Sequence, residues 1–148
     1  MTALAANKKR YVRNLENMQR VGTVLQADSK TLYEGSLSSF DGSGKITNGA
    51  DTAGHRIAGV SVYNSVSGAS NTTIKPELEW GHEEWFPHDG GLVASMLGKD
   101  ATILDDATLS KSATTTNDVT AGMIVELETI NSVAGAWIRV GIYSGTQA

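Results

Sequence analysis

The stretch that decides the fold is GMIVELETINSVAGAWIRVGIY, residues 122–143. In its first half, the apolar residues Met123, Val125 and Leu127 alternate with Ile124, Glu126 and Glu128. In its second half, Ala136, Ile138, Val140 and Ile142 alternate with Trp137, Arg139, Gly141 and Tyr143. A period of two predicts β-strands with one set of side chains turned inward and the other outward. The intervening Asn131–Gly135 suits a hairpin loop.

The same kind of pattern recurs along the rest of the chain after residue 20. Short apolar or alternating runs are separated by clusters of Gly, Asn, Asp and Ser, which is typical of an all-β sandwich or barrel. Asp41-Gly42-Ser43-Gly44 is the strongest of these turns. We expect eight strands, at Val21–Gln26, Thr31–Phe40, Arg56–Val62, Thr73–Trp80, Gly91–Met96, Ala101–Leu104, Gly122–Ile130 and Ala136–Tyr143.

Length and composition limit the class of protein. A chain of 148 residues fits one domain and can bury an ordinary hydrophobic core. There is no cysteine, which excludes disulfides, thiolate catalysis and cysteine–zinc sites. No apolar run approaches the roughly 18–20 residues of a membrane span. We therefore expect a protein that is soluble in the cell that makes it and has no membrane partner.

The first 20 residues differ from the body in charge. They hold five basic residues and one acid, a net charge of +4, whereas residues 21–148 carry −8. Four apolar residues have helical spacing: Leu4, Tyr11, Leu15 and Met18. The basic residues Lys8, Lys9, Arg10 and Arg13 accompany them. We interpret residues 1–20 as an arm, helical or extended, that docks on an acidic groove of a protein partner in preference to nucleic acid.

A cluster of aromatic, acidic and histidine residues runs from Trp80 to Asp89. His82 and His88 with a carboxylate could hold a metal. The spacing is wrong for a helical His-Glu-x-x-His zinc site, however, and Pro87 disfavours a helix. We expect no metal and no other cofactor, and interpret the cluster as an exposed loop that anchors to the body or to a neighbouring subunit. Its interface residues would be Trp80, Trp85 and Phe86.

Enzymatic motifs have little support in the sequence. Acidic residues near this cluster could form a glycosidase pair, but the sequence cannot show the required separation. Neither a Gly-x-Ser-x-Gly elbow nor a complete P-loop occurs. We therefore expect a protein that is not an enzyme.

Two pairs of segments carry a family resemblance. GSLSSFDGSGKIT (35–47), followed by AGHRIAGVS (53–61), resembles the opening of phage capsid decoration, or cement, proteins. GKDATILDDATL (98–109) and then AGMIVE (121–126) resemble the second half of that family. With the segments between them, these stretches cover about two-thirds of the chain. Residues 64–87 depart from a minimal member, which predicts an elaborated loop near 64–90 in a body of residues 21–148.

The resemblance implies a compact β-barrel or sandwich body of the β-tulip kind, often a homotrimer. It implies a place on the exterior of the expanded phage head, with the N-terminal arm reaching major capsid protein. Two other readings remain open at this stage. One is a carbohydrate- or receptor-binding module with Trp80, Trp85 and Trp137 as sugar platforms, and the other is a ring-forming tail-tube or head-completion protein.

Overall fold

Thirteen strands form three antiparallel sheets within residues 11–148, the part of the chain that the computed structural model describes. These residues contain two short 3-10 turns, η1 (Leu15–Asn17) and η2 (Ala94–Met96), and no α-helix. The prediction of an all-β body is confirmed.

The larger sheet has six strands in the order β1-β9-β13-β12-β10-β11. Their bounds are β1 (Val12–Arg13), β9 (Glu83–Pro87), β13 (Val133–Val140), β12 (Thr120–Ile130), β10 (Asp100–Asp105) and β11 (Thr108–Ser110). The sheet curls on itself, as shown by a parallel bridge between His88, just after β9, and Leu109 on β11. The body thus combines a sandwich with partial closure of one sheet.

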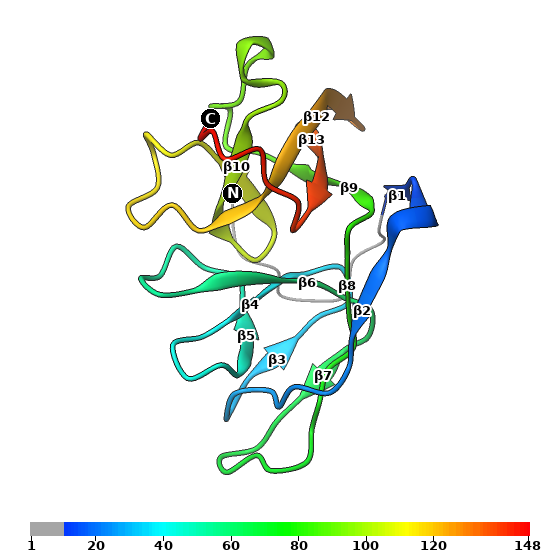
Figure 1. Ribbon diagram of the computed structural model, residues 1–148, viewed down its shortest axis with the longest axis vertical. Coiled ribbons are helices and arrows are strands. Elements are labelled where there is room, and N and C mark those ends of the chain that lie inside the picture. Colours follow the sequence, from blue (N-terminus) through cyan, green and yellow to red (C-terminus); the bar gives the residue numbers. More distant parts are fainter. Residues whose placement is uncertain (1–10) are drawn as a thin grey trace.

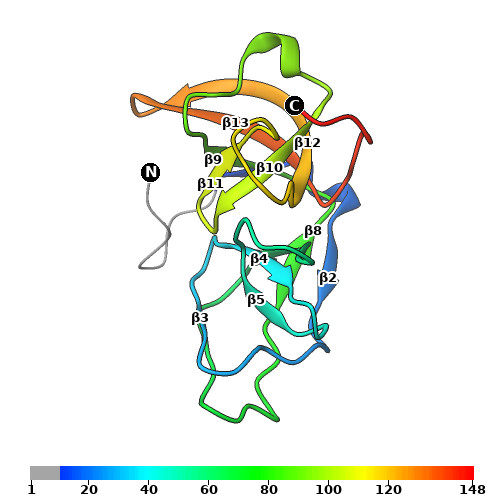
Figure 2. The ribbon, with the colours of Figure 1, turned by 90° about the vertical axis from the view of Figure 1, so that its left-hand side faces the viewer.

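A five-stranded sheet and a two-stranded ribbon complete the fold. The five strands, in the order β2-β8-β6-β4-β5, are β2 (Gln19–Val21), β8 (Leu78–Trp80), β6 (Arg56–Ser61), β4 (Leu37–Phe40) and β5 (Ile46–Asn48). The ribbon pairs β3 (Thr31–Leu32) with β7 (Ser65–Val66). The three sheets follow one another along the long axis, with the six-stranded sheet at one end and the ribbon at the other (Figures 1 and 2).

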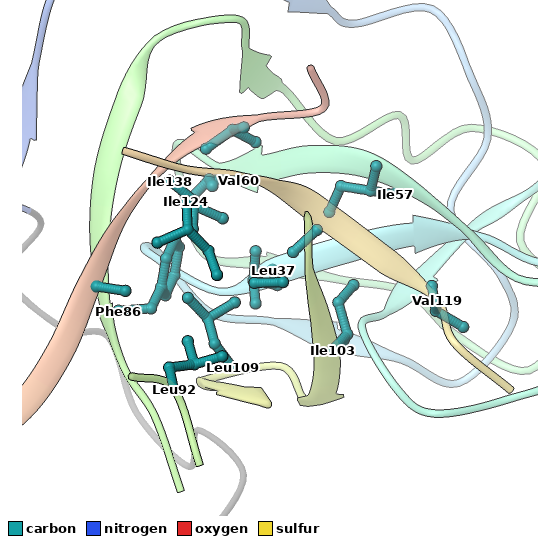
Figure 3. Close-up of a cluster of buried hydrophobic side chains, with 14 residues drawn as sticks. Leu37, Ile57, Val60, Phe86, Leu92, Ile103, Leu109, Val119, Ile124 and Ile138 are labelled. Carbon is teal, nitrogen blue, oxygen red and sulfur yellow. The ribbon is translucent and has the colours of Figure 1, made fainter. Parts of the chain in front are cut away.

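Two hydrophobic clusters lie between these layers. The larger one joins the two main sheets: Leu37 and Val60 come from the five-stranded sheet, and Ile103, Ile124 and Ile138 from the six-stranded sheet (Figure 3). All five side chains are fully buried, and each such burial stabilises the fold by about 1.5–3 kcal/mol. The smaller cluster joins the five-stranded sheet to the ribbon and contains Leu32, Ile46, Ala58 and Leu78.

The hairpin β12–β13 is present as expected, but its turn and register differ from the prediction. Asn131 and Ser132 both have positive φ, so the turn has two residues and β13 already begins at Val133. The register shifts between Ile124 and Glu126. In a regular strand, residues 124 and 126 would lie on the same face. The bulge at Val125 places them on opposite faces, so that Ile124 lies in the core and Glu126 lies outside it, where it accepts from Arg13.

Residues 64–90 do not form the elaborated, exposed loop predicted near them, although the strand predicted at Thr73–Trp80 is present in part as β8. They contain β7, β8 and β9, and all five residues of β9 are buried. The stretch has the composition of a loop, but both faces of β9 are covered, so alternation is absent. The strand predicted at Gly91–Met96 is also wrong, because these residues form an irregular segment that ends in η2.

Candidate functional site: the anchor of the N-terminal segment

Residues 11–21 run along one edge of both main sheets. Strand β1 pairs with β9, and β2 pairs with β8. Between them, Asn14 adopts a left-handed conformation (φ 54°) and η1 makes a single turn. The segment passes so close to Gly81 that a Cβ there would lie 2.5 Å from the carbonyl oxygen of Asn17. The segment is therefore a structural part of the body.

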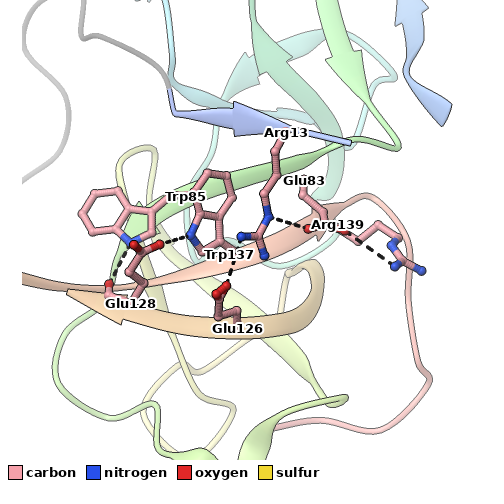
Figure 4. Close-up of polar contacts among 7 residues, drawn as sticks. All are labelled: Arg13, Glu83, Trp85, Glu126, Glu128, Trp137 and Arg139. Atoms are coloured by element: carbon pink, nitrogen blue, oxygen red, sulfur yellow. Dashed lines mark hydrogen bonds and ion pairs between the residues drawn. The ribbon is translucent and has the colours of Figure 1, made fainter. Parts of the chain in front are cut away.

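Arg13 fastens this segment to the outer face of the six-stranded sheet (Figure 4). Its Nε donates to Glu83 Oε1 at 2.8 Å, and its Nη1 donates to Glu126 Oε1 at 3.0 Å. Its guanidinium carbon lies 4.1 Å from the ring centre of Trp137, a cation–π contact. One side chain thus joins β1 to three strands of the same sheet.

The charges of this cluster shift its titration. Burial alone would lower the pKa of Arg13, but the hydrogen bonds to Glu83 and Glu126 and their charges raise it above its ordinary value. Burial alone would raise the pKa of the Glu83 carboxyl. Hydrogen bonds from Arg13 and Asn14 and the charges of Arg13 and Arg139 outweigh burial and lower that pKa. Both groups therefore stay charged at neutral pH, as an ion pair requires.

Two tryptophans lie side by side next to this ion pair. Trp85 and Trp137 are register partners on β9 and β13. Their indole nitrogens both donate to Glu128, Trp85 to its backbone carbonyl at 2.9 Å and Trp137 to its carboxylate at 2.5 Å (Figure 4). Tyr11 meets the Trp85 ring edge to face, with ring centres 5.7 Å apart. We call the outer-face cluster of Tyr11, Arg13, Glu83, Trp85, Glu126, Glu128, Trp137 and Arg139 the anchor face.

Comparisons of the chain with protein-family models, curated proteins and solved structures found no match. Within residues 11–148, no helix is long and apolar enough to cross a membrane. The chain's own residues therefore carry any functional inference.

The predicted arm divides into two parts. Leu4, Lys8, Lys9 and Arg10 lie outside the described residues. Of the others, Tyr11 and Arg13 are committed to the anchor face, Met18 is half-buried, and Leu15 remains 48% exposed. For residues 11–20 the extended alternative is correct apart from the single 3-10 turn η1, and the α-helix is wrong, because strand pairing satisfies backbone groups of β1 and β2 at the two ends of this segment. The boundary predicted at residue 20 does not separate an arm from the body.

Two of the three predicted interface aromatics are in the wrong place for that role. Trp85 is 6% exposed and Phe86 is 4% exposed, and Phe86 belongs to the main core. Trp137 is 8% exposed, so it offers no free sugar platform either. Trp80 is half-buried and lines a hollow of about 290 Å³ together with Val21, Phe40, Ile57, Ala58 and Gly141. Only this member of the predicted set has access to solvent at a concave surface.

The two histidines of the predicted Trp80–Asp89 cluster do not share a set of metal-ligating side chains. His82 is fully buried, with Nε2 2.7 Å from Glu84 Oε1. His88 Nδ1 accepts a hydrogen bond from the Gly90 amide at 2.9 Å, and burial lowers the His88 pKa despite the charge of Asp89. Residues 11–148 contain no group of three or more His, Asp or Glu side chains that could hold a metal ion.

Half of the anchor face was not among the predicted site residues: Glu83, Glu126, Glu128 and Arg139. Glu126, Glu128, Trp137 and Arg139 alternate along the hairpin, and a search for charged and aromatic residues facing one another across it could have found them. The contact of Arg13 with Glu83, 70 residues away, leaves no local trace in the sequence.

Proposed function

We propose that this chain is a structural virion protein that binds the outside of an expanded phage head as an oligomer and cements neighbouring capsomers. The four segments that resemble decoration proteins support this. Gly35–Thr47 spans the β4–β5 hairpin, and Ala53–Ser61 contains β6. Gly98–Leu109 contains β10 and most of β11, and Ala121–Glu126 lies in β12. These segments therefore coincide with strands around the main core.

The observation that carries the proposal is a basic segment joined to a fixed anchor on an acidic body. Residues 1–10 hold three basic residues and no acid, whereas residues 11–148 hold 9 basic and 16 acidic residues, a net charge of −7. Tyr11 and Arg13 fix the point where the basic segment joins the body. A partner surface with acidic grooves would attract this segment and repel the body, which orients binding.

A protein of this kind needs only modest affinity at each contact. A protein that binds only the assembled lattice stabilises the lattice by mass action. Ten residues can span at most about 33–36 Å, which limits the distance between the anchor at Tyr11 and any contact that the basic segment makes. In a homotrimer three such segments act together, and multivalency multiplies a weak single contact.

Co-sedimentation with undecorated, expanded heads tests the proposal. The full chain is compared with a variant lacking residues 1–10, which leaves both edge strands intact, and with a triple variant Lys8→Gln, Lys9→Gln, Arg10→Gln. The matched control removes three charges from the body instead, in Lys30→Gln, Lys45→Gln, Lys75→Gln. We expect the full chain and the control to pellet with heads, and both N-terminal variants to bind at least about tenfold more weakly.

Two results would count against this function. One is a failure of the full chain to bind expanded heads, and the other is the formation of rings in electron micrographs, which would favour a tail-tube or head-completion protein. Equal binding by all four proteins would instead contradict the role of the basic segment. Sedimentation equilibrium of the purified chain shows separately whether the homotrimer forms without the head.

A further inference from the structure

A polar pocket of about 330 Å³ lies away from the anchor face. Its lining consists of His55, Arg56, Asp118, Val119, Thr120 and Tyr143. These residues come from the start of β6, the loop before β12 and the segment after β13. The volume lies at the lower end of the roughly 300–1,000 Å³ of small-ligand sites.

Hydrogen bonds to carboxylates fix two of the pocket's walls. Asp51 accepts from the amides of Thr116 and Asn117, both at 2.7 Å, and this joins the turn before His55 to the loop that carries Asp118. Asp100 accepts from the amides of Ser144 at 2.6 Å and Gly145 at 3.0 Å, which holds the segment that carries Tyr143. The walls are thus preorganised, which lowers the entropic cost of binding.

The pocket presents donors that the fold does not use. The exposed Arg56 guanidinium makes no hydrogen bond or ion pair with any residue of 11–148. His55 Nδ1 is buried without a partner, which favours the tautomer that carries its proton on Nε2. The Thr120 hydroxyl oxygen accepts from Gln147 at 2.9 Å and keeps its own proton to donate. Tyr143, which is 51% exposed, adds a phenol.

Acidic groups limit which anion fits. Asp118 lines the pocket; one of its oxygens accepts from Thr115 at 2.9 Å, and its other oxygen has no hydrogen bond within residues 11–148. Burial and the charge of Asp100 raise the pKa of Tyr143, while Arg56 opposes them, so the phenol stays neutral and can donate. A dianion such as phosphate would face the Asp118 carboxylate and could pair with only one free guanidinium, that of Arg56. A monoanion with hydroxyl groups can pair with Arg56 and also donate to Asp118.

We propose that this pocket binds a hydroxylated carboxylate of the uronic-acid class. Its carboxylate pairs with the Arg56 guanidinium, its hydroxyls meet Asp118 and Thr120, and its ring lies against Tyr143. This inference does not depend on the proposed role on the phage head.

Titration of the ¹⁵N-labelled full chain with glucuronate, followed by NMR chemical shifts, tests the site. Acetate keeps the carboxylate without the ring hydroxyls, glucose keeps the hydroxyls without the carboxylate, and inorganic phosphate supplies a dianion. We expect saturable shifts at His55, Arg56, Thr120 and Tyr143 with glucuronate at about millimolar concentration, and weaker binding of the other three.

Variants distinguish binding in the pocket from nonspecific attraction to positive charge. Arg56→Gln should weaken glucuronate binding at least about tenfold, whereas Lys75→Gln removes an exposed positive charge elsewhere and should leave it unchanged. Asp118→Asn should weaken glucuronate binding more than acetate binding, so that the ratio of the two affinities falls. The proposal is overturned if glucuronate gives no saturable shifts, if Arg56→Gln binds as well as the native chain, or if phosphate binds more tightly than glucuronate. Thermal melts show that each variant is folded.

Discussion

Arg13 combines two ion pairs and a cation–π contact in one side chain. Because its side chain is 37% exposed, solvent screens part of this attraction. We expect Arg13→Ala to lower the free energy of unfolding by about 1–2 kcal/mol. Arg20 is the matched control, since it also pairs with two glutamates but is 56% exposed. Arg20→Ala should cost less than about 1 kcal/mol, and equal losses in urea titrations of the two variants would contradict the anchoring role.

Glu83 gives the anchor face a defined pH dependence. Its pKa in the folded chain is lowered from the ordinary value of 4.5. Its stabilising effect is therefore fully present above pH 4.5 and is lost as the pH falls through the folded pKa. We expect Glu83→Gln to destabilise the protein more at pH 7 than at pH 3, as measured by urea unfolding. The same difference at both pH values would show that Glu83 acts by packing alone.

The Trp85 ring lies against Gly135 on β13. A Cβ at this position would lie 2.2 Å from ring carbons of Trp85. Gly135→Ala should therefore lower the free energy of unfolding by about 1–3 kcal/mol. Gly22→Ala serves as the control, because a Cβ added at Gly22 would meet no atom within 4 Å. If both substitutions leave the urea midpoint unchanged, the tryptophan is not held against Gly135.

At the scale of elements, the N-terminal segment divides at residue 10. Removing residues 1–10 leaves β1 and β2 in place, so we expect little change in the unfolding midpoint. Removing residues 1–21 deletes an edge strand from each main sheet. That deletion should cost more than Arg13→Ala, at least about 2 kcal/mol, because the pairing with β8 and β9 is lost as well. Differential scanning calorimetry of both truncations measures this.

The strands that could be predicted are those with a clear alternation of side chains or with a short apolar run between turn residues; β6 and β10 are of the second kind and are mostly buried. The β12–β13 hairpin shows this alternation, and its core residues Ala136, Ile138 and Val140 are fully buried. Strand β9 has no such pattern, because Phe86 faces the core while Trp85 is covered on the other side by Tyr11. Strands covered on both faces carry no period of two, so their pairing becomes visible only in three dimensions.

For the whole molecule, the two main sheets depend on one another. Leu37 on β4 is fully buried in the core that β10, β12 and β13 complete, and its amide donates to the Asp106 carbonyl at 2.8 Å. The Ala50–Asp105 bridge adds a further link between the two sheets. Neither sheet can bury its apolar face without the other, so the body should unfold in one transition. The anchor face and the polar pocket would then be lost together.

Leu37→Ala tests this cooperativity. The substitution leaves a cavity between the sheets and should lower the free energy of unfolding by about 2–5 kcal/mol. Hydrogen exchange should then accelerate to the same extent in β6 of one sheet and β13 of the other, because both are exposed only by global opening. Faster exchange confined to the five-stranded sheet would mean that the two sheets unfold separately. In that case the six-stranded sheet could hold the anchor face without help from the rest of the body.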